Sequence, residues 1–183
     1  LWPLFHDAVR YPEYHRRWWA PYSEVNRRFA DVTAASLGPG DVCWVHDYHL
    51  QLVPALIRQQ VPDARIGFFL HIPFPPPSLF AQIPWRRELL EGVLGSDLVA
   101  FQTERDATNF AEACVAHTEA RGSGGHLEYR GRSVRIRSCP ISIDVAGFDE
   151  LARDPEVQQE ARRIREQVDD RQIVLGIDRL DYT

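Results

Sequence analysis

The 183-residue sequence contains no methionine, no lysine and only three cysteines. Because a natural reading frame starts with methionine, we expect the chain to be an internal piece of a longer protein. All 21 basic residues are arginine, which we attribute to a GC-rich coding bias rather than to chemistry. Cys43, Cys114 and Cys139 are far apart and show no C-x-x-C spacing, so neither a disulfide framework nor a cysteine zinc site is indicated. We expect reduced, buried thiols.

Long hydrophobic runs are also missing. No apolar run approaches the roughly 20 residues that span a bilayer, and Leu1-Trp2-Pro3 lacks the features of a signal peptide. We therefore expect a cytoplasmic protein that does not contact membranes. The net charge of −5, with arginines scattered in pairs, argues against a nucleic-acid partner. The 44% of apolar residues and 26% of charged residues are typical of a globular domain with a sizeable core.

Short apolar runs alternate with helical patterns along the chain. The runs that we expect to form strands cover residues 41–45, 65–71, 97–101 and 172–177. The run over 65–71 has Phe68 and Phe69 at its centre, which suits a strand covered on both faces in a parallel sheet. The order of elements predicts an α/β fold with a doubly wound sheet. A second sheet is expected to open near Asp144, so the predicted domains are 1–143 and 144–183.

Capping and turn residues predict where the helices and hairpins begin. Ser23, Thr103 and the pair Asp154-Pro155 each predict a helix start. The side chains expected to face the core are Val25, Phe29 and Val32 on the first of these helices, and Ala107, Phe110, Cys114 and Val115 on the second. Residues 121–125 hold three glycines and predict a flexible turn. Residues 127–143 predict a hairpin and a strand that ends at Cys139-Pro140.

Polar residues gather where the predicted strands end. Asp47 and His49 follow the first strand, His71 follows the second, and Arg179 follows the last. Open α/β sheets bind ligands beyond the carboxyl ends of their strands, so these positions indicate a ligand site. The prolines after His71 predict a stiff loop at this edge. Trp2 belongs to an aromatic-rich segment and could pack in the core or stack on a sugar.

Two other kinds of site fit parts of this pattern. His46-Asp47-x-His49 supplies metal-ligand residue types at close spacing, although side chains at a strand end need not point at one centre. General acid/base hydrolysis would need a pair of carboxyl groups, and the sequence does not clearly aim two acidic residues at one place. Each residue also has a structural interpretation, since a histidine after a strand can close a turn by local hydrogen bonding.

Four motifs in order resemble the trehalose-6-phosphate synthase family of retaining glucosyltransferases. They are Trp-Val-His46-Asp47-Tyr48-His49-Leu, Ile-Gly-Phe-Phe-Leu-His71-Ile-Pro-Phe-Pro, Phe101-Gln-Thr-Glu104 and Gly176-Ile-Asp-Arg179-Leu-Asp-Tyr. The resemblance covers most of the chain. It implies the GT-B arrangement of two facing Rossmann-like domains. Residues 1–143 would then be the acceptor-side domain without its first strands, and 144–183 the linker with the first helix and strand of the donor-binding domain.

The resemblance also implies a role for each matching residue. Asp47 would bind hydroxyls of the acceptor, glucose-6-phosphate, and orient the attacking hydroxyl. Trp2 and Ile72 would wall the acceptor pocket. His71 would contact the glucose of the donor, UDP-glucose, and Arg179 would contact its diphosphate. An arginine suits this last role because its guanidinium forms charge-assisted pairs with phosphate oxygens.

The implied reaction transfers glucose from UDP-glucose to glucose-6-phosphate with retention and without a protein nucleophile. UDP-glucose would be a co-substrate, and neither a cofactor nor a metal is expected. A homo-oligomer of the full-length protein is expected, and the isolated segment is expected to be inactive. Alternatives within the fold are a glucosylglycerol-phosphate synthase-like enzyme or a GDP- or ADP-glucose donor. From a different class, a non-catalytic regulatory protein of the same fold stays open.

Overall fold

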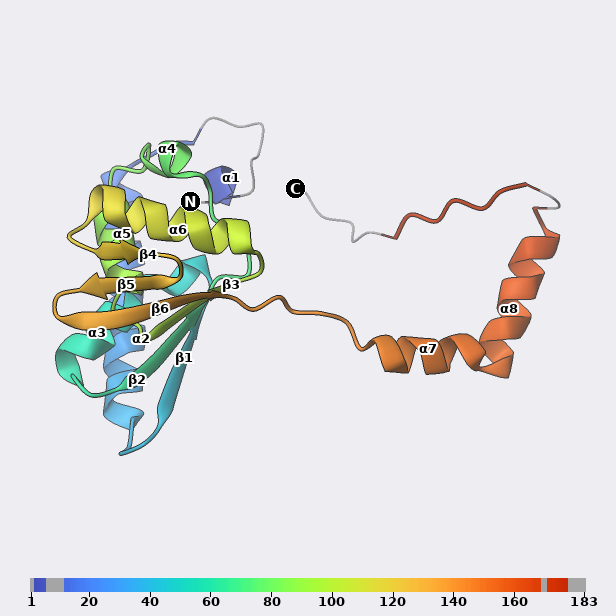
Figure 1. Cartoon of the computed structure of the whole chain (residues 1–183), viewed down its shortest axis with the longest axis horizontal. Coiled ribbons are helices and arrows are strands. Elements are labelled where there is room, and N and C mark those ends of the chain that lie inside the picture. Colours follow the sequence, from blue (N-terminus) through green and yellow to red (C-terminus); the bar gives the residue numbers. More distant parts are fainter. Residues whose placement is uncertain (1, 6–11, 169–170, 178–183) are drawn as a thin grey trace. The chain divides into compact units, whose positions relative to one another are not determined.

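The computed structural model of the chain describes residues 2–5, 12–168 and 171–177 (Figure 1). The helices are α1 (Trp2–Phe5), α2 (Arg16–Ser36), η1 (Tyr48–Leu50, a 3-10 turn), α3 (Val53–Gln60), α4 (Pro77–Phe80), α5 (Arg86–Val93), α6 (Glu104–His117), α7 (Val145–Arg153) and α8 (Pro155–Glu166). The strands are β1 (Val42–His46), β2 (Arg65–Phe69), β3 (Leu98–Phe101), β4 (Arg121–Ser123), β5 (His126–Tyr129) and β6 (Arg132–Ser138).

The described strands form one six-stranded sheet in the order β1-β2-β3-β6-β5-β4. The neighbours among β1, β2, β3 and β6 pair in parallel, and β5 and β4 extend the sheet as antiparallel strands. Helices connect β1 to β2, β2 to β3 and β3 to β6, as parallel pairing requires (Figure 1). The predicted α/β fold with a parallel sheet is therefore confirmed.

The core lies where the sheet meets its helices. The centre of β2 is buried, as the sequence predicts, with Phe68 and Phe69 at 2% and 4% exposure. Helix α6 packs on β3 and β6, while α3 packs on β2, α2 and α5. A phenylalanine cluster from different elements fills the interior, and its fully buried members include Phe80, Phe101 and Phe110. Burial of several such rings contributes a large share of the folding free energy, about 1.5–3 kcal/mol each.

The first long helix differs from the prediction. Helix α2 starts at Arg16 rather than after Ser23, which lies inside it. Its buried side chains are Asn26 and Ala30, while Val25, Phe29 and Val32 are 47%, 52% and 69% exposed in this structure. The polar partners of Asn26, described below, set which face of α2 turns inward. The apolar stripe therefore predicted the wrong face.

The region between α6 and β6 also differs in detail. Residues 121–123 form the short strand β4 instead of a turn, and the reversal to β5 occurs at Gly124 and Gly125. Both glycines have positive φ, at 62° and 86°, which allows so tight a reversal. The predicted hairpin is present as β5 and β6, joined at Arg130-Gly131. Strand β6 ends at Ser138, directly before the predicted Cys139-Pro140.

The inner face of α6 and the cysteines are mostly as expected. Thr103 caps α6 by accepting the Asp106 N–H at 3.2 Å. Ala107, Phe110 and Cys114 are buried, whereas Val115 is 46% exposed and lies at the edge of that face. Cys43 and Cys114 are buried free thiols, as predicted. Cys139 is exposed because it follows the end of β6, so the expectation of a buried thiol is wrong there.

The chain folds as two compact units, Leu1–Pro140 and Ile141–Thr183. The predicted boundary at 143/144 lies close by, and the assignment of the second part to a donor-binding domain stays a prediction. In the second unit Asp154 caps α8 and Pro155 is its first residue, as expected. Residues 171–177 have no regular secondary structure, so the strand predicted over 172–177 is wrong here. A lone strand has no neighbour with which to form a ladder.

None of the helices within the described ranges is long and apolar enough to cross a bilayer.

Candidate functional site

The carboxyl ends of β1, β2, β3 and β6 lie at one edge of the sheet because these strands are parallel. Asp47 directly follows β1, and His71 is two residues beyond β2. The Asp47 N–H donates to the Phe69 carbonyl at 2.8 Å, so the two strand ends stay paired up to the predicted site. The structure thus places Asp47 and His71 at a shared edge, where open α/β sheets bind ligands.

Asp47 has an unusual backbone conformation. Its φ of 68° and ψ of 169° lie in a region that residues with a side chain rarely adopt. Its Oδ1 accepts the Tyr48 N–H at 2.9 Å and caps the 3-10 turn. Such strain costs about 1–3 kcal/mol and persists only where surrounding contacts impose it, which often occurs at functional sites.

Helix α2 imposes the turn after Asp47 through the buried Asn26 and the partly buried Tyr22. The Asn26 amide donates to the His49 carbonyl at 2.9 Å and accepts the Leu52 N–H at 3.0 Å. The Tyr22 hydroxyl donates to the Tyr48 carbonyl at 2.9 Å. Burial raises the pKa of this hydroxyl, so it remains a donor. Neither residue was predicted from the sequence to support the site, although a lone asparagine among apolar helix positions was an available signal.

The loop after β2 is held by the first turns of α6. Asp106, 5% exposed, accepts the Phe74 N–H through Oδ1 at 2.9 Å and the Thr103 hydroxyl through Oδ2 at 2.7 Å. The Asn109 amide donates to the Phe74 carbonyl at 2.9 Å. Both backbone polar groups of Phe74 are therefore fixed from one helix. The proline-rich loop that carries His71 and Ile72 is anchored as well as stiff.

An aromatic cluster brings α1 to the same loop. The Phe5 ring contacts the Phe74 and Phe80 rings edge-on, at centroid distances of 5.7 and 6.2 Å. Helix α1, which begins at Trp2, therefore lies beside the loop containing Ile72. Ile72 is half-buried against the core, and the Trp2 side chain is outside the described part. The contacts bring the segments of Trp2 and Ile72 together.

His71 contacts His46, which the sequence suggested only as a possible metal ligand. Its Nε2 lies 2.9 Å from Nδ1 of His46, and the two rings are 5.2 Å apart with 21° between their planes. Both side chains come from the same edge of paired strands. His49, by contrast, lies against the Tyr48 ring at 3.9 Å.

The other predicted features have mixed outcomes. The described residues contain no group of three or more potential metal ligands, and His46 and His49 make separate contacts. Arg179 lies outside the described residues, so its predicted diphosphate contact is not placed. The carboxylates near this edge, Asp47 and Asp106, are engaged by backbone N–H groups.

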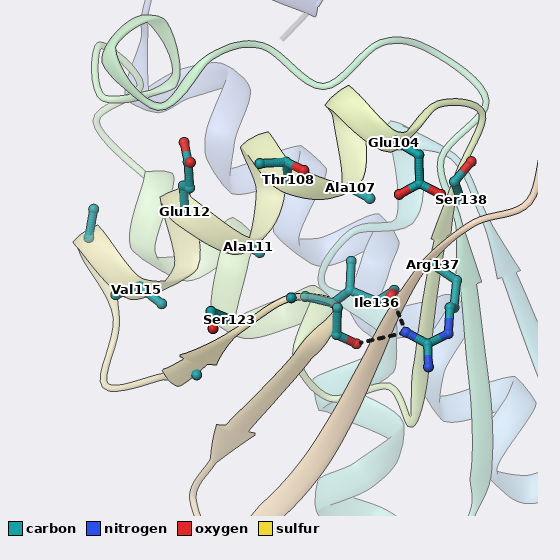
Figure 2. A pocket seen from close by; sticks show the side chains of 14 residues that line it. Glu104, Ala107, Thr108, Ala111, Glu112, Val115, Ser123, Ile136, Arg137 and Ser138 are labelled. Atoms are coloured by element: carbon teal, nitrogen blue, oxygen red, sulfur yellow. Dashed lines mark hydrogen bonds between the residues drawn. The ribbon is translucent and has the colours of Figure 1, made fainter.

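Several cavities occur in the described part of the first unit, and one of about 400 Å³ lies between α2 and β1 with Trp44 and His46 in its lining. One of about 430 Å³ is lined by aromatic side chains of α2, including Trp19 and Tyr22, and by Tyr48, His49 and Trp85. It borders the turn that follows Asp47. Another, of about 600 Å³, lies between α6 and the β4–β5 reversal, with Glu104 and Arg137 among its residues (Figure 2). Figure 2 shows the Arg137 guanidinium bonded to backbone carbonyls at this cavity, which contains none of the predicted site residues.

Comparison with known proteins gives one consistent result. The sequence profile of Glycosyltransferase family 20 matches residues 1–183. A curated trehalose-6-phosphate synthase of Mycobacterium sp. (strain JLS) is 49% identical over the whole chain, which covers 40% of that protein's length. A solved UDP-forming trehalose-phosphate synthase from Burkholderia xenovorans superposes with a TM-score of 0.83 at 32% identity, with 100% of this chain and 41% of that chain covered.

A second similar structure holds a nucleotide sugar. It is an E. coli protein described as trehalose-6-phosphate bound with UDP-2-fluoro glucose. It superposes with a TM-score of 0.78 at 32% identity and covers 89% of this chain and 37% of that chain. The chain therefore spans about two fifths of the length of the proteins that it matches.

Proposed function

The chain belongs to Glycosyltransferase family 20, and we propose that its whole protein transfers glucose from UDP-glucose to glucose-6-phosphate with retention, releasing UDP. The observation that carries this proposal is the match over all 183 residues, joined to 49% identity with a named trehalose-6-phosphate synthase. The similar E. coli structure with a UDP-glucose analogue supports the choice of donor.

The proposed chemistry exchanges one bond at the anomeric carbon. The bond from the anomeric carbon of the donor glucose to the UDP oxygen breaks, and its electron pair stays on the UDP oxygen. The same carbon forms a new bond to the anomeric hydroxyl oxygen of glucose-6-phosphate. The proton of that hydroxyl is transferred to a phosphate oxygen of the departing UDP. Retention follows when attack and departure occur on the same face, with an oxocarbenium-like transition state between them. Neither a cofactor nor a metal is part of the proposal.

We assign Asp47 to the acceptor. Its position beyond β1, its strained backbone and its support by α2 all fix the carboxylate at the sheet edge. A fixed carboxylate can accept hydrogen bonds from sugar hydroxyls and hold the attacking hydroxyl near the anomeric carbon. Ile72 and Trp2 would wall this side, since their segments meet at Phe5 and Phe74.

We assign His71 to the donor sugar and Arg179 to its diphosphate. His71 lies on the anchored loop at the same edge, so a sugar hydroxyl can reach its imidazole. Negative charge grows on the UDP oxygens as the bond breaks, and an arginine would stabilise it most in a site that excludes water. The placement of Arg179 relative to His71 stays a prediction. So do the homo-oligomeric state, the lack of a nucleic-acid partner, the cytoplasmic location and the inactivity of the isolated segment.

A UDP-release assay on the full-length protein tests the proposal. UDP-glucose is the donor, and glucose-6-phosphate or glycerol-3-phosphate is offered as acceptor, beside the Asp47→Ala variant. Release that depends on glucose-6-phosphate and is lost in the variant supports the proposal. Release only with glycerol-3-phosphate would support the glucosylglycerol-phosphate alternative. Folded protein that releases no UDP with either acceptor would support the regulatory alternative.

A further inference from the structure

The hydrogen bond between His46 and His71 occupies a specific ring nitrogen. Nε2 of His71 lies 2.9 Å from Nδ1 of His46, within the range of a direct hydrogen bond. One of these nitrogens must carry the proton and the other must present a lone pair. The second ring nitrogen of His71, Nδ1, is therefore the one left for a sugar hydroxyl, and its protonation is tied to the bond with His46.

Two further rings restrict the pair. His46 lies against the Trp44 ring at 4.6 Å, and His71 lies against the Phe69 ring at 4.7 Å. Side chains at i and i+2 of a strand point to the same face, so β1 carries Trp44 and His46 on one face. Phe69 ends β2 and contacts His71, which lies two residues beyond that strand. The exposed His46 imidazole therefore contacts the Trp44 ring and the His71 ring.

We propose that His46 is a positioning residue for glucosyl transfer. It holds the His71 imidazole in one orientation and one tautomer, so that Nδ1 of His71 meets a hydroxyl of the donor sugar. The inference rests on the proposed function, because it assigns His46 to the donor side of the same site. His46 acts through His71 and need not touch a substrate.

Three substitutions of His46 separate the hydrogen bond from the ring. His46→Phe keeps an aromatic ring and removes the nitrogen. His46→Asn places an amide near the position of Nδ1, whereas the longer side chain of His46→Gln places its amide near Nε2. His126→Phe, on an exposed position of β5, is the matched histidine-to-phenylalanine control.

Steady-state kinetics of the full-length protein should show a donor-specific defect. We expect His46→Phe to raise KM for UDP-glucose, or to lower kcat/KM for UDP-glucose, by about 3- to 10-fold. A change of this size corresponds to the loss of one hydrogen bond. KM for glucose-6-phosphate and the urea unfolding midpoint should stay at the wild-type values. His46→Asn should restore most of the loss, His46→Gln should not, and His126→Phe should match the wild type.

A double-mutant cycle tests whether His46 acts through His71. In the His71→Ala background, adding His46→Phe should cause no further loss, because the group that it positions is already gone. Equal losses in both backgrounds would overturn the proposal. The proposal would also be overturned if the His46→Phe variant were as active as the wild type. A kinetic defect matched by an equal loss of stability in the urea unfolding midpoint would overturn it as well.

Imidazole NMR gives a readout that does not need activity. In 15N-labelled protein, His71 should show two distinct ring-nitrogen signals of a single tautomer, and His46→Phe should average them. Assignment follows from the His46→Phe and His71→Ala spectra. If the wild type lacks transferase activity, the proposed function fails, while these spectra still decide whether His46 fixes His71. Averaged signals in the wild type would overturn the positioning role.

Discussion

The Asp106 carboxylate accepts the backbone N–H of Phe74 at 2.9 Å and so ties α6 to the loop that carries His71 and Ile72. The second carboxylate oxygen accepts the Thr103 hydroxyl at 2.7 Å. A loop rich in proline has few N–H groups to offer, so each one that is buried needs a partner. This contact explains how an irregular segment keeps a fixed position at the edge of the sheet.

Replacing Asp106 by alanine should destabilise the fold and loosen this loop. The variant leaves the buried Phe74 N–H without its acceptor, at a cost of about 1–3 kcal/mol in the free energy of unfolding. Urea unfolding followed by circular dichroism measures this loss. Asp106→Asn keeps an acceptor oxygen and should lose less. Equal stabilities of the wild type and Asp106→Ala would show that the hydrogen bond contributes little.

Replacing Asn26 by leucine should cost more, because two partly buried backbone groups lose the buried amide that pairs with them. The His49 carbonyl and the Leu52 N–H both bond to the Asn26 side chain. We expect a loss of about 2–4 kcal/mol from unsatisfied polar groups despite the added apolar surface. Thermal and urea unfolding measure it. Arg28→Leu, an exposed position on the same helix, should stay within about 0.5 kcal/mol of the wild type.

Acid should weaken the fold partly through Asp97. Burial opposes ionisation of this carboxyl, but the Ile66 N–H and the guanidinium groups of Arg58 and Arg132 outweigh it and lower its pKa. A group with a lowered folded-state pKa stabilises above its unfolded pKa, and this contribution disappears as the pH falls through the folded pKa.

Urea midpoints measured from pH 7 down to about pH 2.5 test this dependence in wild type and Asp97→Asn. At neutral pH the variant should be less stable by about 1–3 kcal/mol, a value limited by the partial exposure of the carboxylate. The two stabilities should converge in acid. Curves that stay parallel over the whole range would contradict the assignment to Asp97.

Two substitutions of Asp47 should differ in stability but not in activity. Glycine adopts a φ of 68° without strain, so Asp47→Gly should be more stable than Asp47→Ala by about 1 kcal/mol. Both variants remove the carboxylate and should lose UDP release that depends on glucose-6-phosphate. Unfolding and activity are measured on the same preparations. An active glycine variant would show that the carboxylate is not needed to orient the acceptor.

Strong local signals predicted several elements correctly. The buried run with Phe68 and Phe69 became a central strand, Thr103 capped α6, and Asp154-Pro155 began α8. Each of these signals is contained within a few neighbouring residues. The predictions failed where contacts with residues distant in the sequence determine the structure. Helix α2 buries Asn26 instead of Val25. Residues 172–177 form no strand, because they have no neighbouring strand to pair with.

The sequence by itself determined the alternation of strands and helices, the family motifs and the sheet edge where Asp47 and His71 lie. Backbone preferences and side-chain periodicity act between residues that are close in the sequence, so a single sequence is enough to predict them. Only the tertiary structure decided that Nδ1 of His46 meets Nε2 of His71 and that Asp106 holds Phe74. These contacts join residues 25 and 32 positions apart, and their geometry depends on strand register and helix packing.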